Sequence, residues 1–90
     1  MEIEFDAGKD RINREKHGIS LAAAADMDLE VAQVIPDERR DYGEARYWAV
    51  GPIIGRLHVL AFTMRGQRLR AISLRKANER ERRRYERARP

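Results

Sequence analysis

Hydrophobic and polar residues alternate at the start of the chain, where Ile3 and Phe5 lie between acidic residues. A period of two is typical of a short strand with one buried face. The segment 7–17 is poor in apolar residues and predicts a surface helix, because Asp6 can cap its start and Gly18 can end it. The chain is therefore expected to begin with a strand and a helix.

An alanine-rich segment, residues 21–32, predicts a second helix. Ser20 is suited to cap its N-terminus. Leu21, Ala24 and Ala25 then form one stripe at the helical period of 3.6 residues. Small alanine side chains would let this helix approach a sheet closely.

Four later segments have the pattern of strands. Residues 33–36 form a short one that Pro36 ends, since proline cannot donate a hydrogen bond to a ladder. A polar loop follows, and then residues 46–54, 56–64 and 67–75, which are joined by short turns containing glycine. Short connections favour an antiparallel meander. The middle strand is largely apolar on both faces, so we expect it at the centre.

Strict alternation in the last strand gives two sets of side chains on opposite faces, namely Leu69, Ala71, Ser73 and Arg75 against Arg68, Arg70, Ile72 and Leu74. A final helix rich in arginine and glutamate begins after Asn78, which has the spacing of a capping box with Glu81. Tyr85 falls on the same helical face as Glu81. The prediction is one α+β domain, residues 1–90, with a short N-terminal strand and two helices packed on an antiparallel meander sheet and a C-terminal helix.

Charge is divided unevenly along the chain. Residues 1–45 carry 6 basic and 12 acidic side chains, whereas residues 46–90 carry 13 basic and 3 acidic ones, so the halves have net charges of −6 and +10. Arginine outnumbers lysine by 16 to 3, and the guanidinium group matches phosphate oxygens bidentately. The basic half therefore favours a polyanionic partner, either nucleic acid or an acidic protein.

Several other classes of protein fit poorly. The chain has no cysteine, its two histidines are 41 residues apart, and it has no HExxH spacing, so we expect no metal site. Glycine-rich phosphate-binding motifs are missing, and we expect no cofactor. The N-terminus has no apolar signal core and no apolar run could span a bilayer, which favours the cytoplasm.

Along this order of elements the chain has a particular set of residues, namely Phe5, Asp6, Lys9, Asn13, Lys16, His17, Gly18, Ile19, Gly43, Glu44, Arg46, Leu57, Val59, Thr63, Arg65, Arg70, Ile72, Ser73, Arg75, Ala77, Glu81 and Tyr85. In these residues and in the order of its elements, the chain resembles the BrnT family, toxins of bacterial type II toxin–antitoxin systems. The resemblance implies a RelE-like fold and RNA cleavage without a metal. It also implies neutralisation by a BrnA-type antitoxin with a ribbon-helix-helix domain, in a heterotetramer built around an antitoxin dimer.

Metal-free RNA cleavage needs a base for the 2′-hydroxyl proton, cationic donors around the phosphorane, and an acid for the 5′-oxygen. Arg65 and Arg75 are candidates to clamp the scissile phosphate. Glu81 is a candidate base or arginine partner, and alternatively only a helix cap. His17 can act as acid or base near neutral pH, or simply stabilise a helix end. Tyr85 can donate a proton or stack on a base, and is equally suited to pack the last helix.

The expected RNA-binding side chains outside this group are Lys16, Arg68, Arg70, Arg80, Arg83 and Arg84. Trp48 is expected in the core, with base stacking or antitoxin contact as the alternative, and His58 is expected to be structural. The leading prediction is an endoribonuclease toxin. The competing hypothesis is a non-catalytic basic module that binds nucleic acid or an acidic protein.

Overall fold

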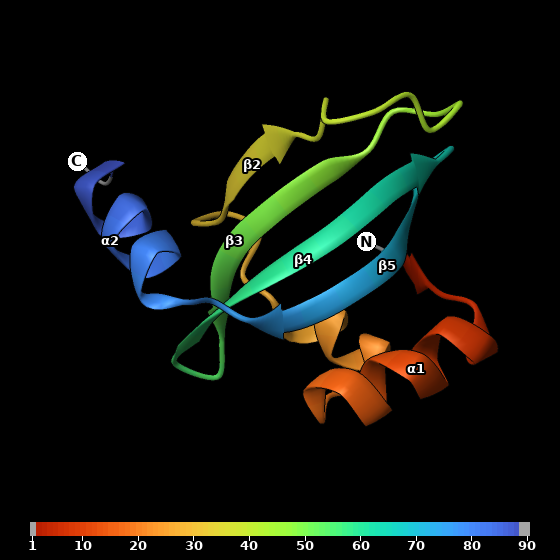
Figure 1. The fold of residues 1–90 in the computed structure, drawn as a ribbon, viewed down its shortest axis with the longest axis horizontal. Coiled ribbons are helices and arrows are strands. Elements are labelled where there is room, and N and C mark those ends of the chain that lie inside the picture. The colour runs from red at the N-terminus through yellow and green to blue at the C-terminus, as the bar shows by residue number, and fades with distance from the viewer. Residues whose placement is uncertain (1, 89–90) are drawn as a thin grey trace.

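The computed structural model describes residues 2–88. Its elements in chain order are β1 (Glu2–Glu4), α1 (Ala7–His17), the 3₁₀ helix η1 (Leu21–Asp26), β2 (Gln33–Pro36), β3 (Tyr47–Ile53), β4 (Arg56–Arg65), β5 (Arg68–Lys76) and α2 (Glu79–Ala88). The strands form one five-stranded sheet in the order β1-β5-β4-β3-β2 (Figure 1). The fold is α+β, and the predicted meander of β3, β4 and β5 is confirmed, with β4 at the centre.

The two edge strands complete the sheet in different ways. β2 pairs with β3 in antiparallel orientation. β1 pairs with β5 in parallel orientation, so the sheet is mixed rather than purely antiparallel. Because β1 reaches only the first three residues of β5, the rest of that strand has a free edge, and α1 lies beside it (Figure 1).

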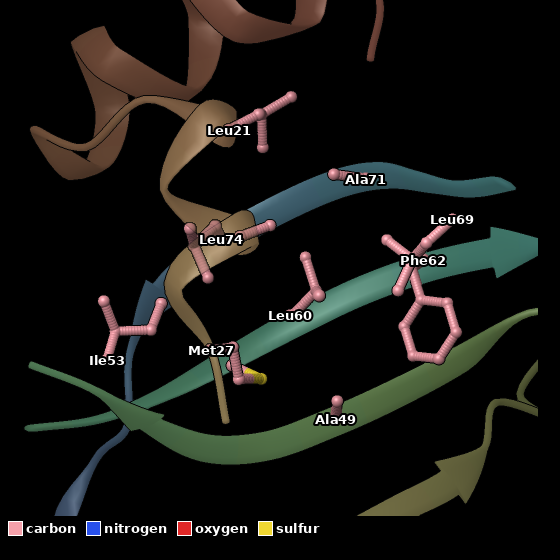
Figure 2. Close-up of a cluster of buried hydrophobic side chains, with 10 residues drawn as sticks. Leu21, Met27, Ala49, Ile53, Leu60, Phe62, Leu69, Ala71 and Leu74 are labelled. Atoms are coloured by element: carbon pink, nitrogen blue, oxygen red, sulfur yellow. The ribbon is translucent and has the colours of Figure 1, made fainter. Parts of the chain in front are cut away.

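One face of the sheet, called here the covered face, carries the main hydrophobic core beneath η1 (Figure 2). Its buried side chains are Leu21, Ala24, Met27, Ala49, Ile53, Leu60, Phe62, Leu69, Ala71 and Leu74. They come from η1 and the segment after it and from β3, β4 and β5. Burial of this apolar area is the main stabilising term for the arrangement.

The predicted ends of α1 are confirmed. The Asp6 carboxylate accepts a hydrogen bond from the Lys9 backbone N–H at 3.0 Å, as an N-cap does. Gly18 adopts a φ of 70° and donates its N–H to the Arg14 carbonyl. This left-handed conformation is cheap for glycine, and it ends the helix cleanly.

The second predicted helix is wrong in type and length. Ser20 does cap it, but the segment is a 3₁₀ helix that ends at Asp26 instead of continuing to residue 32. With three residues per turn, positions 21, 24 and 27 face the sheet. Met27 is accordingly buried, whereas Ala25, expected in the stripe, is exposed.

A β-bulge in β5 overturns the strict alternation predicted for that strand. Ala61 pairs with Ser73 but its neighbour Phe62 pairs with Ala71, so Ile72 is an extra residue on β5. The inserted residue reverses the parity on its two sides. Leu74 therefore joins Leu69 and Ala71 in the core, and Arg75 is turned to the opposite face.

That opposite face, called here the open face, has Val59, Ala61 and Thr63 of β4 along its middle. α2 covers only one end of it, where Tyr85 packs against Val50 and Val59. Figure 1 shows α2 at the far end of the sheet from α1, near β2 and β3. Within residues 2–88, no helix has both the length and the apolar character needed to cross a membrane.

Candidate functional site

Four arginines belong to the open face, and the bulge is the reason that they share it. Arg65 continues the alternation of β4 on this face and pairs across the turn with Arg68. Arg70 and Arg75 lie on opposite sides of the bulge, and both pair with open-face residues of β4. Without the extra residue, Arg70 and Arg75 would point to opposite faces.

Each of these arginines has a carboxylate within ion-pair distance. The nitrogen–oxygen separations are 2.9 Å for Arg70 and Glu4, 3.4 Å for Arg68 and Glu2, 3.8 Å for Arg65 and Glu44, and 2.7 Å for Arg75 and Glu81. Partly exposed ion pairs add little to stability. At Arg65, Arg68 and Arg70, a phosphate group, which offers the same bidentate geometry, can therefore replace the carboxylate at modest cost.

The pair between Arg75 and Glu81 is the best formed of the four. Arg75 Nη1 and Nη2 lie 2.7 Å and 2.8 Å from the two Glu81 carboxylate oxygens, so the contact is bidentate. Glu81 also accepts the Asn78 backbone N–H, and Asn78 accepts the Glu81 N–H, at 2.9 Å and 2.8 Å. The predicted capping box is confirmed, and the same carboxylate holds the arginine.

These contacts set the protonation of Glu81. The Arg75 guanidinium holds the pKa of Glu81 below its ordinary value, and the hydrogen bond from the Asn78 N–H acts in the same direction. Glu81 in turn raises the pKa of Arg75. A carboxylate of lowered basicity is a poor proton acceptor at neutral pH. The geometry therefore suits Glu81 to orient Arg75.

The predicted clamp of Arg65 and Arg75 on one phosphate is not supported. In the pairing of β4 with β5, Arg75 lies opposite Val59, which is six residues before Arg65 in β4. Six residues of strand span roughly 20 Å. Arg65 lies at the Glu44 end of the open face and Arg75 at the α2 end, so the two serve different parts of a ligand.

Tyr85 has a packing role in this structure. Its side chain is buried against Val50 and Val59. Its hydroxyl group donates to the Val31 carbonyl at 2.9 Å, and its own carbonyl accepts from the Gln33 side chain. The predicted proton donation or base stacking by Tyr85 is not supported by this geometry, because the ring is covered and the proton is committed.

His17 and Lys16 lie at the free edge of β5. Together with Ile72 and Ser73 they line a hollow of about 240 Å³. His17 is half-buried and Lys16 is exposed. The hollow borders the bulge at Ile72, three residues before Arg75 in β5.

Asn13 is the residue that fixes this edge, and its position was not foreseen. It is buried, and it accepts the Leu74 N–H at 3.0 Å while donating to the Leu74 carbonyl at 2.9 Å. It also donates to the Ile19 carbonyl. Asn13 thus takes the place of a neighbouring strand, and His17, four residues later, lies on the same helical face. Only the family resemblance singled out Asn13.

The arginines of α2 differ in their surroundings. Arg82 makes ion pairs with Glu79 and with Glu86, and Arg83 pairs with Glu79 at 3.2 Å. Arg80 and Arg84, two of the predicted RNA-binding residues, are exposed. Arg84 lines a hollow beside β2 and β3.

A second cluster on the open face centres on Asp37, which follows β2. Its carboxylate accepts hydrogen bonds from Arg39, Tyr42 and the Trp48 indole N–H, the last at 3.0 Å. The Arg39 guanidinium, and then the other donors, hold the pKa of Asp37 far below its ordinary value. Arg39 also stacks on the Trp48 ring, 4.5 Å from its centroid. Hydrophobic periodicity carries no signal for such a polar cluster.

Trp48 and His58 have the following environments. Trp48 is half-buried beside the small cluster of Val50 and Val59, which agrees with the core interpretation for one side of its ring. His58 is buried, and its Nδ1 lies 2.8 Å from the Arg56 carbonyl. The position predicted for His58, inside a core strand, is confirmed by this burial.

A larger hollow lies elsewhere. It measures about 430 Å³ and is lined by the β3–β4 turn and the start of α2, including Arg56, Arg82 and Glu86. None of the predicted catalytic side chains lines it. Within residues 2–88, no three histidine or acidic side chains gather as metal ligands would.

A protein-family model matches most of the chain. The model of a family described as the ribonuclease toxin BrnT of type II toxin–antitoxin systems matches residues 5–81. The matched region runs from the residue after β1 to Glu81 and so includes the whole open-face arginine set. No curated protein matches the chain.

Proposed function

Since the chain belongs to the BrnT family of ribonuclease toxins from type II toxin–antitoxin systems, we propose that it cleaves RNA on its open face without a metal ion. Membership in the family implies an RNA substrate and an antitoxin partner. The observation that carries the site assignment is the set of arginines that the β5 bulge collects on one face.

The proposed reaction is an in-line transesterification. The 2′-hydroxyl group loses its proton to a base, its oxygen forms a bond to the adjacent phosphorus, and the bond from phosphorus to the 5′-oxygen breaks. The leaving 5′-oxygen takes a proton from an acid. The products are a 2′,3′-cyclic phosphate and a 5′-hydroxyl end, and the negative charge that builds up on the phosphorane needs fixed donors.

Arg75 is proposed to supply those donors. Its bidentate contact with Glu81 holds the guanidinium plane at the open face, so little reorganisation is needed when phosphate arrives. Glu81 is proposed to position Arg75 instead of acting as the base. Arg65, at the other end of the face, is proposed to bind a different phosphate of the same strand.

His17 is proposed as the proton-transfer group. It lies on the same helical face as Asn13. Asn13 is hydrogen-bonded to Leu74, the residue directly before Arg75. Imidazole side chains commonly serve as the acid or base in proton transfer. Lys16, exposed in the same hollow, adds positive charge at the β5 edge.

The remaining basic side chains are proposed to bind the RNA backbone through counterion release, which makes binding strongly dependent on salt. They lie on β5 and on the exposed surface of α2, and they are Arg68, Arg70, Arg80, Arg83 and Arg84. Their positions place them on both sides of Arg75 along the chain.

The test is cleavage of RNA by purified protein in excess EDTA, with analysis of the product ends. We expect 2′,3′-cyclic phosphate ends, and cleavage about 10²-fold slower by an Arg75→Ala control that melts at the same temperature. Intact RNA after incubation with folded wild-type protein would contradict the proposal. Activity that appears only when a divalent ion is restored would contradict its metal-free part.

We also propose that the fold is RelE-like, which is supported by two helical segments beside one face of the meander. The antitoxin is proposed to be a BrnA-like ribbon-helix-helix protein, and the complex a heterotetramer around an antitoxin dimer. The proposed place of action is the cytoplasm. A short ribbon-helix-helix reading frame next to this gene, whose product co-purifies with the toxin at equal stoichiometry, is the expected result. An unrelated neighbour would contradict it.

A further inference from the structure

The Trp48 side chain lies on the open face near α2, and its ring is held in a fixed orientation. In the sheet it pairs with Ala61 of β4 and with Ile35 of β2. Its indole N–H donates to Asp37, whose side chain is only 4% exposed. The ring cannot rotate without breaking that bond. Trp48 packs against the hydrophobic cluster around Val50, and Arg39 lies over its ring.

Arg39 lies over this ring in a position from which a ligand can displace it. Its guanidinium lies 4.5 Å from the ring centroid, yet its side chain is 65% exposed. A cation–π contact at such an exposed position is weak, whereas a base stacked on an aromatic ring is worth more. A stacking ligand can therefore displace Arg39 from the ring.

The space beside the ring is suited to a nucleotide. Trp48, Ile35 and Pro36 give it apolar walls, and Arg39 and Arg84 line it with positive charge, around a hollow of about 160 Å³. The one carboxylate of the lining, Asp37, accepts hydrogen bonds from Tyr42 and the Trp48 indole N–H as well as from Arg39, so it keeps two partners when Arg39 moves off the ring. An aromatic platform beside cations is the usual arrangement for holding an unpaired base and its phosphate.

We propose that this hollow is a subsite for one unpaired base of the RNA substrate, stacked on Trp48 in place of Arg39, with Arg84 at the adjoining phosphate. The inference rests on the proposal that the open face holds RNA. Trp48, Ala61 and Ser73 form one row across β3, β4 and β5, and two strand spacings amount to about 10 Å. The subsite thus lies about 10 Å from β5 across the sheet. It requires that a nucleotide near the cleaved bond be unpaired.

The chain contains one tryptophan, so its fluorescence reports this site directly. The probe is a short 2′-O-methylated oligoribonucleotide, which has no free 2′-hydroxyl and stays intact. Anisotropy of a labelled copy measures binding independently of tryptophan emission. We expect binding to be accompanied by quenching, and an abasic oligonucleotide of equal length to bind the arginines without quenching.

Variants give a second measurement. Trp48→Leu should weaken binding of the oligonucleotide about tenfold, as loss of one base stack does, while its affinity for the abasic strand stays that of the wild type. Arg84→Gln should weaken binding of the oligonucleotide more than Arg83→Gln, which removes an arginine of the same helix that does not line the hollow. If Trp48→Leu does not fold, the wild-type quenching comparison still decides.

The outcomes separate the subsite from the ribonuclease proposal. Binding without quenching, or equal quenching by the abasic strand, overturns the subsite, and cleavage of unmodified RNA then leaves the ribonuclease proposal standing. No binding by folded protein overturns both. Quenching by the purified antitoxin but not by the oligonucleotide would assign the hollow to a protein contact and overturn the base-binding inference.

Discussion

The Arg75 side chain depends on two neighbours, since the bulge at Ile72 turns it to the open face and Glu81 fixes its guanidinium plane. We expect Arg75→Ala to lower the single-turnover cleavage rate on the order of 10²-fold, as loss of a transition-state donor does. Arg68→Ala is the matched control, because Arg68 lies on the same strand and face but at the far end. It should weaken RNA binding and leave the rate at saturation unchanged. Equal rate losses in the two variants would contradict the assignment.

Asn13 gives the corresponding prediction for stability. Replacing it with alanine leaves the buried Leu74 N–H and carbonyl without partners at the edge of β5. An unsatisfied buried polar group costs about 1–3 kcal/mol, so the free energy of unfolding in urea should fall by at least that amount. Ile12→Ala, an exposed change on the same helix, should stay within about 0.5 kcal/mol of the wild type. A wild-type midpoint for Asn13→Ala would refute this role.

At the scale of elements, the hydrophobic pattern located every strand, and the caps located the ends of α1. It could not show the bulge, because Leu69, Ala71 and Leu74 all face the core, and their spacing of two and then three residues fits no single strand period. The type of η1 was equally hidden, since an alanine-rich segment favours an α-helix locally. Packing of Met27 under the sheet decides the tighter 3₁₀ period instead. The site residues were named without their contacts, because contacts such as that of Asn13 with Leu74 join positions 61 residues apart.

The β3–β4 hairpin carries a strained residue. Ile54 has a φ of 47° and Gly55 a φ of 77°, and Ile54 is 90% exposed. Two positive φ angles are typical of a type I′ turn, for which Asn-Gly is the favoured sequence, while a β-branched residue is disfavoured there. Ile54→Asn should therefore raise the free energy of unfolding by about 1–2 kcal/mol. Ile54→Val, which keeps the branched Cβ, should not. Destabilisation by asparagine would argue against this turn geometry.

At the scale of the molecule, four carboxylates have pKa values held below the ordinary range by specific donors. The main donors are the Leu21 N–H for Asp10 and the arginines for Asp37, Glu79 and Glu81. A lowered folded-state pKa contributes stability above the unfolded-state pKa, and that stability is lost as pH falls through the folded-state pKa.

We therefore expect the urea midpoint to be level between about pH 5 and 7 and to fall below about pH 4. Asp10→Asn should flatten part of the acid decline, because it removes one of the four titrating groups. Glu15→Gln, an exposed change on the same helix, serves as the control. A urea midpoint that rises as the pH is lowered would contradict the prediction.

The antitoxin should stabilise the whole toxin. The chain of 90 residues has a net charge of +4. Its excess positive side chains repel one another until a partner covers them. A partner that binds only the folded state adds stability by mass action, and an excess of about 100-fold over Kd should raise Tm on the order of 10 °C. Melting followed by circular dichroism at increasing antitoxin concentration tests this. Superimposable melting curves at saturation would rule it out.

The parallel pairing of β1 with β5 has a consequence for how the toxin is made. The first strand finds its partner only near the end of the chain, and Asn13 likewise waits for Leu74. Contacts between such distant positions form late, and during synthesis the N-terminal part emerges long before them. A stalled or truncated copy that ends before β5 lacks both the sheet edge and Arg75. Incomplete translation products of this toxin should therefore be harmless to the cell that makes them.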